Sequence, residues 1–197
     1  MTNPVTHCTR LFMMLALFTP GLLAAQTAAT SSSGTATTDS TEKSMTSESG
    51  DKAFVKKALE GGNAEVKLGQ LAEQKSQSED VKQFGQKMVN DHTQLGDQMK
   101  PIAQQLKVSV PTGIPAKDQM LYSKLEKLSG SEFDREYIKA MLKDHQEDLK
   151  EFKKEASTGK NPEVKQAAQQ GSTVISQHLS MIQQIAQKHQ VSASGGE

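Results

Sequence analysis

The 197-residue chain contains no tryptophan, two tyrosines and one cysteine. Cys8 precedes the first apolar stretch, in a segment that we expect to be cleaved off, so the mature chain is predicted to lack disulfides and thiolate metal sites. The chain also lacks an excess of either charge, because 23 basic side chains balance 23 acidic ones. These charges alternate without a basic cluster, which argues against nucleic acid or an anionic lipid surface as a partner.

The N-terminus has the layout of a secretory signal. Arg10 is the only charged residue before an uncharged stretch from Leu11 to Ala25, which ends in small residues. Such a stretch is shorter than the roughly 20 residues that a transmembrane helix needs. We therefore expect residues 1–25 to be a signal peptide, and the protein to be exported to the periplasm or cell envelope without a transmembrane span. An uncleaved membrane anchor is the alternative.

Composition divides the remainder of the chain into three parts. Residues 26–50 are rich in serine and threonine and nearly devoid of apolar side chains, which predicts a disordered tether. Residues 51–190 are long enough for one domain with one core. Residues 191–197 are predicted to be a flexible tail.

The domain is predicted to be all-α, since it is rich in Ala, Leu, Lys, Glu and Gln. A ferritin-like four-helix bundle has a single long crossover connection, and here a long connection with a short extra helix is expected between the second and third long helices. An up-down bundle with an elaborated loop is the alternative. The expected long helices span about 51–76, 78–107, 131–158 and 162–189, and the short one 116–128.

Each long helix is predicted to carry one ionisable residue within its apolar stripe. The sequence Met88-Val89-Asn90-Asp91-His92 recurs as Met141-Leu142-Lys143-Asp144-His145, and His178 occupies an equivalent place in the last helix. With a rise of about 1.5 Å per residue, all these groups lie near the middle of the bundle. In the first helix the expected stripe is Phe54, Ala58, Gly61, Glu65, Leu68 and Ala72.

Two interpretations of this polar core remain open. In the first, Glu65, His92, His145 and His178 bind a divalent metal or copper, with copper, zinc and iron as candidates. Asp91 and Asp144 would then orient the imidazoles. In the second, the polar groups hydrogen-bond to one another in a structural or interaction module whose partner is another envelope protein or a second copy of the chain.

Three methionines, Met88, Met141 and Met181, each lie one turn from a core histidine. They are candidates for soft copper ligands, although methionine is also a common core residue. No nucleophile–base pair or substrate cleft is evident, so an enzyme ranks behind both interpretations.

Several segments resemble a large bacterial family of exported proteins. They are Phe54-Val55-Lys56-Lys57, Gly61-Gly62-Asn63-Ala64-Glu65-Val66, the two Asp-His pairs, Gly130-Ser131-Glu132-Phe133-Asp134 and His178-Leu179. Members are labelled a domain of unknown function or an outer membrane protein, and are grouped with the ferritin-like superfamily.

The resemblance spans residues 52–188 and implies a ferritin-like bundle in the cell envelope, without a known reaction. The chain lacks the Glu-x-x-His motif of di-iron members, since Val89, Leu142 and Ile175 precede the three histidines by three positions. This speaks against a carboxylate-bridged di-iron oxidase.

Overall fold

A computed structural model describes residues 38–192 of the chain. This part is entirely helical and contains no strand, which confirms the all-α prediction. None of its helices is long and apolar enough to cross a membrane. The predicted signal peptide, residues 1–25, lies outside the described residues. The helices are α1 (Thr38–Lys75), α2 (Glu79–Gln105), α3 (Ala116–Glu126), α4 (Gly130–Thr158) and α5 (Pro162–Lys188).

The predicted start of the first helix is wrong. Helix α1 begins at Thr38 and not at Asp51, so it enters the segment 26–50 that we expected to be disordered. Residues 38–49 contain neither proline nor glycine, and extending an existing helix adds a hydrogen bond for each residue fixed. The division of the chain into signal, tether, domain and tail remains a prediction.

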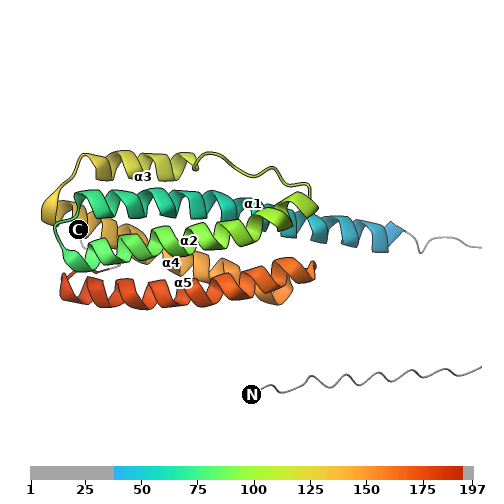
Figure 1. The fold of residues 1–197 in the computed structure, drawn as a ribbon. Coiled ribbons are helices and arrows are strands. Elements are labelled where there is room, and N and C mark those ends of the chain that lie inside the picture. Colours follow the sequence, from blue (N-terminus) through green and yellow to red (C-terminus); the bar gives the residue numbers. More distant parts are fainter. Residues whose placement is uncertain (1–37, 193–197) are drawn as a thin grey trace, which may run out of the picture. The chain divides into compact units, whose positions relative to one another are not determined.

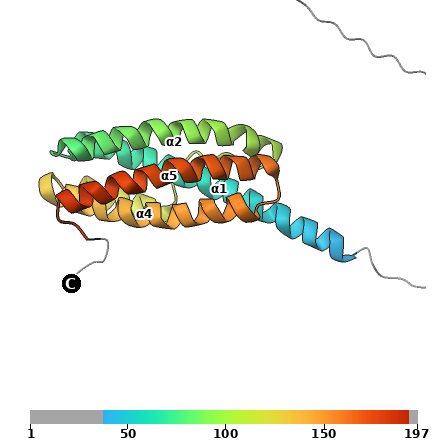
Figure 2. The same cartoon turned by 90° about the horizontal axis from the view of Figure 1, so that it is seen from below.

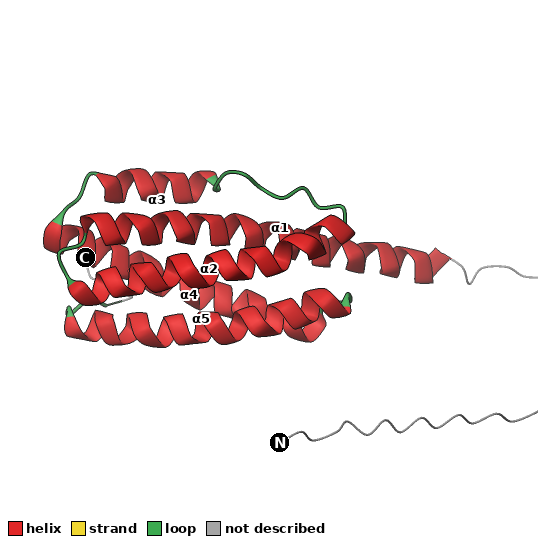
Figure 3. Cartoon of the chain, in the orientation of Figure 1, coloured by secondary structure: helices red, strands yellow, loops and turns green. Residues whose placement is uncertain are grey.

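The helices form two antiparallel hairpins that pack side by side (Figure 1). Helices α1 and α2 make one hairpin, α4 and α5 the other, and α1 contacts α4 while α2 contacts α5. Between α2 and α4 the chain returns along the length of the bundle through α3 and its flanking loops (Figure 3). The connection is therefore a crossover, and α3 lies outside the hairpins against α1 and α4.

Helices α1 and α2 approach closely at a pair of glycines. A Cβ atom on Gly69 would lie 2.6 Å from the carbonyl oxygen of Gly85, and one on Gly85 would lie 2.7 Å from that of Gly69. Real Cβ atoms do not come so near to backbone oxygen, so the spacing of this hairpin requires glycine at both positions. The close approach lies one turn from Glu65 in α1 and thereby sets how near α2 comes to that residue.

The core consists of two apolar clusters. The larger contains Phe84, Tyr137 and Ile182, and the smaller contains Val55 and Met99. Along α1, α2 and α5 the polar residue of the stripe falls between the residues that belong to the two clusters. The bundle therefore holds its ionisable groups at mid-height, with an apolar layer on either side. Figure 2 shows α5 running alongside both α2 and α4.

The apolar stripe of α5 is buried as predicted, whereas that of α1 is buried at Glu65, Leu68 and Ala72 and only partly buried before them. Between residues 52 and 64 of α1 the buried residues are Val55, Leu59 and Ala64, while Phe54 and Ala58 are only partly buried. Helix α1 contacts three helices, α2, α3 and α4, so its buried surface is wider than a single stripe.

Truncating Ile182 to alanine should lower the free energy of unfolding by about 2–5 kcal/mol, since it removes a fully buried side chain. Leu95→Ala should cost less, because Leu95 is only partly buried and borders a cavity. Denaturant unfolding of both variants checks this order. Equal losses would mean that the cavity beside Leu95 is closed in solution.

Candidate metal centre

Three histidines from three helices converge in the core. His92 belongs to α2, His145 to α4 and His178 to α5, and their relative exposures are 5%, 0% and 0%. One nitrogen of each ring lies within 4.8 Å of the other two. The ring centroids are 5.2 to 6.1 Å apart. The sequence predicted that these residues share a level, and the structure brings them together.

Each imidazole has a hydrogen-bond acceptor for one of its nitrogens. His92 Nδ1 lies 2.9 Å from Glu65 Oε2, and His178 Nε2 lies 2.7 Å from Asp91 Oδ2. His145 Nδ1 lies 3.0 Å from the carbonyl oxygen of Met141, one turn earlier in α4. Because a carboxylate or a carbonyl only accepts, the nitrogens of His145 and His178 that face these groups carry the protons of neutral imidazoles. His92 Nδ1 carries its proton in the same way when Glu65 is ionised.

The remaining nitrogen of each ring is buried and has no hydrogen-bond partner. These atoms are His92 Nε2, His145 Nε2 and His178 Nδ1. Burying a polar group without a partner costs roughly 2–7 kcal/mol. With their protons on the opposite side of each ring, the three nitrogens offer only lone pairs and cannot hydrogen-bond to one another.

All three imidazoles are neutral at physiological pH. Burial lowers the pKa of His92, His145 and His178 to about 4, although nearby carboxylates oppose the shift in each case. Phe84 contributes to this environment, because its ring centroid lies 6.0 Å from that of His145 and 6.2 Å from that of His178. Neutral imidazole is the form that binds metals.

Glu65 lies beside the histidine cluster, where it touches two of the rings. Its Oε2 lies 2.9 Å from His92 Nδ1, whereas its Oε1 has no hydrogen-bond partner and lies 3.6 Å from His145 Nε2. Burial raises the pKa of Glu65 to about 8, against the opposing effect of His145. The carboxylate of Glu65 lies close to those of Asp144 and Asp148. Its predicted role as a ligand of the histidine-bound ion therefore stays a prediction.

The two aspartates predicted to orient imidazoles lie in different surroundings. Asp91 bonds to His178 on the facing helix and not to its neighbour His92, and it also accepts from Lys87 at 2.8 Å. Burial raises the pKa of Asp91, but these two hydrogen bonds outweigh it and hold the pKa below its usual value. Asp144 instead lies 3.6 Å from the ammonium group of Lys117.

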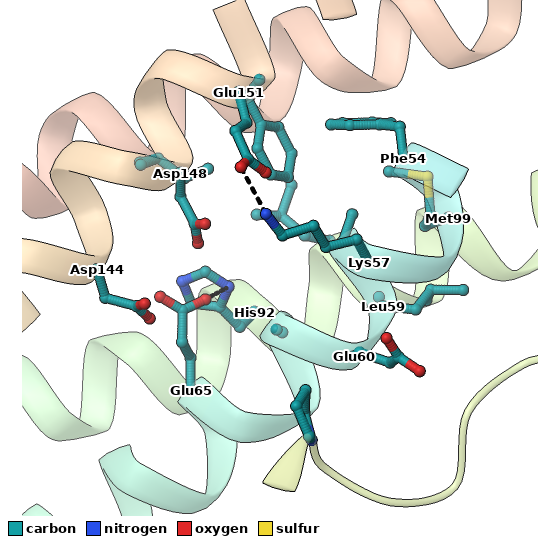
Figure 4. A pocket seen from close by; sticks show the side chains of 18 of the residues that line it. Phe54, Lys57, Leu59, Glu60, Glu65, His92, Met99, Asp144, Asp148 and Glu151 are labelled. Atoms are coloured by element: carbon teal, nitrogen blue, oxygen red, sulfur yellow. Dashed lines mark hydrogen bonds and ion pairs between the residues drawn. The ribbon is translucent and has the colours of Figure 1, made fainter. Parts of the chain in front are cut away.

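A cavity of about 400 Å³ opens beside Glu65 and His92 (Figure 4). The sequence did not predict a cleft here. It is bordered by exposed side chains such as Lys57 and by the buried Glu65, so it leads from the surface towards the core. Its acidic lining residues are Glu60, Glu65, Asp118, Asp144, Asp148 and Glu151.

The candidate methionines belong to the apolar core. Met88 and Met141 are fully buried in the larger cluster, and Met181 is partly buried against it. Sequence reasoning missed two groups near the site. One is the carbonyl of Met141, which could have been identified because it lies four residues before His145, one helical turn away. The other is Asp148, one turn beyond Asp144 on the same face of α4.

Comparison with solved structures shows a similar fold in proteins of low sequence identity, among them the following three. A DUF305 protein from Streptomyces coelicolor has a TM-score of 0.65 at 11% identity, covering 77% of this chain and 99% of its own. A DUF305 fragment from Deinococcus radiodurans has a TM-score of 0.63 at 14% identity, covering 71% and 96%. CopM in the Cu(I)-bound form has a TM-score of 0.60 at 22% identity, covering 70% and 96%.

No curated protein matches the chain in sequence. A family model does match it, over residues 35–185, and its description is "Domain of unknown function (DUF4142)". This stretch includes Glu65, all three core histidines and the aspartates around them. The chain belongs to the DUF4142 family of domains of unknown function.

Proposed function

We propose that this domain binds one Cu(I) ion through His92, His145 and His178. The observation that carries the proposal is the set of three buried ring nitrogens that have no partner, on three converging rings of which one nitrogen each lies within 4.8 Å of the other two. Three buried lone pairs without a hydrogen-bond partner favour a cation, and one metal ion can satisfy all three at once. The partners of the opposite nitrogens, Glu65, Asp91 and the carbonyl of Met141, would fix each ring in its binding tautomer.

The neutral, buried ligands and the likeness of the fold to CopM both favour copper in its monovalent state. Imidazole suits copper, zinc, iron and nickel alike, but the three ligands are neutral and nearly fully buried. A monovalent ion therefore brings less uncompensated charge into the core than a divalent one, and burying charge is costly. The fold also resembles that of CopM, whose structure is of a Cu(I)-bound form.

The setting of this function is the cell envelope. An exported location is supported by the secretory layout of residues 1–25 and by the description of the Streptomyces coelicolor neighbour as secreted. The crossover between α2 and α4 supports placing the bundle among ferritin-like folds. With bound copper buried in the core, we expect the protein to sequester the ion and not to catalyse a reaction.

A competition titration tests the proposal directly. Purified protein under anaerobic conditions should take one equivalent of Cu(I) from a chromophoric Cu(I) chelator, and His145→Gln should take almost none. Zn²⁺ and Fe²⁺, titrated in parallel, should bind more weakly. If the wild-type protein leaves all the copper on the chelator, the core is a structural polar cluster and the domain is an interaction module.

Asp91→Asn should weaken Cu(I) binding about 10–100-fold, which is typical of losing a carboxylate that orients a histidine ligand. An asparagine side chain can present its NH₂ group to His178 and stabilise the other tautomer. The matched control is Asp97→Asn, also on α2, whose exposed carboxylate pairs with Lys100. Chelator competition measures the Cu(I) affinity of both variants. Equal affinities would show that Asp91 does not orient His178 for copper binding.

The stabilisation by Cu(I) should persist to lower pH than is usual for histidine sites. Protons compete with metal for the same nitrogens, but a folded-state pKa of about 4 keeps these rings unprotonated until the pH approaches 4. The copper-dependent rise in thermal midpoint should therefore be similar at about pH 7 and pH 5.5 and be lost near pH 4. A gain that halves near pH 6.5 would show that the rings titrate as if exposed.

A further inference from the structure

A second group of potential ligands lies on the cavity side of the histidine cluster. One carboxylate oxygen from each of Glu65, Asp144 and Asp148 lies within 4.8 Å of the other two. Glu65 comes from α1 and the two aspartates from successive turns of α4, and in Figure 4 the three side chains point towards the same space. The separation suits a small cation, since oxygens on opposite sides of Ca²⁺ lie about 4.6–5.2 Å apart, and of Mg²⁺ about 4 Å.

The buried glutamate shows that this cluster is more than a set of surface acids. Glu65 is 2% exposed, and its Oε1 has no hydrogen-bond partner although its Oε2 is bonded to His92. A buried carboxylate oxygen without a donor is costly. Two lysines line the same cavity: Lys117 lies 3.6 Å from Asp144 and 3.8 Å from Asp118, and Lys57 pairs with Glu151. Neither lysine forms an ion pair with Glu65 among the described residues.

We propose that Glu65, Asp144 and Asp148 form a second cation site, which takes a hard divalent ion such as Mn²⁺ and is distinct from the tri-histidine site. Oxygen-only ligands select hard ions, whereas imidazole nitrogens select softer ones. The cavity gives a divalent ion access and leaves room for the water ligands that such ions retain. Glu65 borders both sites, because its oxygens lie 2.9 Å from His92 Nδ1 and 3.6 Å from His145 Nε2 while one of them also lies within 4.8 Å of Asp144 and Asp148.

Mn²⁺ is a suitable probe because the paramagnetic resonance signal of the free hydrated ion disappears on binding. Copper-free wild-type protein should bind one Mn²⁺ with a dissociation constant of about 10⁻⁴–10⁻³ M, the range of weak Ca²⁺ sites in extracellular modules. Asp148→Asn should weaken this binding at least about tenfold, since it removes one of three charged ligands. Glu147→Gln, an exposed acid on the same helix, should leave it unchanged.

Two further variants keep the outcome decisive. His145→Gln should lose Cu(I) binding and keep Mn²⁺ binding. Circular dichroism shows whether Asp148→Asn is folded, and Asp144→Asn replaces that variant if it is not. The proposal is overturned if Asp148→Asn and the wild type bind Mn²⁺ equally, if neither binds it at millimolar concentration, or if only His145→Gln abolishes binding. Failure to bind Cu(I) while Mn²⁺ binds would overturn the proposed function alone.

Discussion

His178→Ala should abolish the stabilisation that Cu(I) confers on the wild-type protein. A ligand present at 100 times its dissociation constant stabilises the folded state by about 2.7 kcal/mol if it binds only that state. Removing one of three ligands should reduce this gain to nearly zero under the same conditions. Thermal unfolding of both proteins, measured without Cu(I) and with an excess of Cu(I) buffered by a chelator, gives the copper-dependent change in stability of each.

The matched control for this experiment is His189→Ala. His189 caps the end of α5, where its Nε2 bonds to Asp80 at 3.1 Å, away from the histidine cluster. The variant loses a hydrogen bond but should keep the full copper-dependent gain. If His178→Ala destabilises the protein equally with and without copper while the wild type gains nothing, the polar core is structural.

Asp148→Asn should stabilise the metal-free protein, and more so as the pH rises. Burial, followed by the charges of Glu65 and Asp144, raises the pKa of Asp148 to about 8. A group whose folded-state pKa lies above its unfolded value favours folding at low pH, and this contribution is lost as the pH rises from about 4 through 8. Since one pKa unit is worth about 1.4 kcal/mol, the variant should gain on the order of 2–5 kcal/mol above pH 8.

Denaturant unfolding in the presence of a metal chelator, at about pH 5 and pH 9, measures this effect. The gain should be small at the lower pH, where the wild-type carboxyl is already protonated. Glu147→Gln on the exposed side of α4 serves as the control and should be neutral at both values. A loss of stability on replacing Asp148 at the higher pH would mean that its carboxylate has a cationic partner in solution.

The sequence was informative where a helix has a single buried face. The stripe of α5 could be predicted residue by residue, including His178, because the 3.6-residue period leaves one choice of inward face. In α1 the same reasoning selected Phe54 and Ala58 over Val55 and Leu59, since periodicity does not reveal that three other helices surround it. The start of α1 was missed because composition alone suggested a tether.

The level of the candidate site was predictable, but its chemistry was not. A constant rise per residue placed Glu65 and the three histidines at mid-height in the bundle. Which nitrogen of each ring faces inward depends on the rotation and spacing of helices, and no sequence pattern specifies these. For the same reason the bond from Asp91 to His178, across two helices, and the meeting of Glu65 with Asp148 became visible only in the structure.

The most direct test of the central claim is copper X-ray absorption spectroscopy on the full-length protein loaded with one equivalent of Cu(I). The account predicts a three-coordinate ion with nitrogen neighbours only and with the outer-shell scattering of imidazole rings. The same spectrum should be absent from His145→Gln, which has one ligand fewer. A first shell containing methionine sulfur, or copper bound equally by the His145→Gln variant, would contradict it.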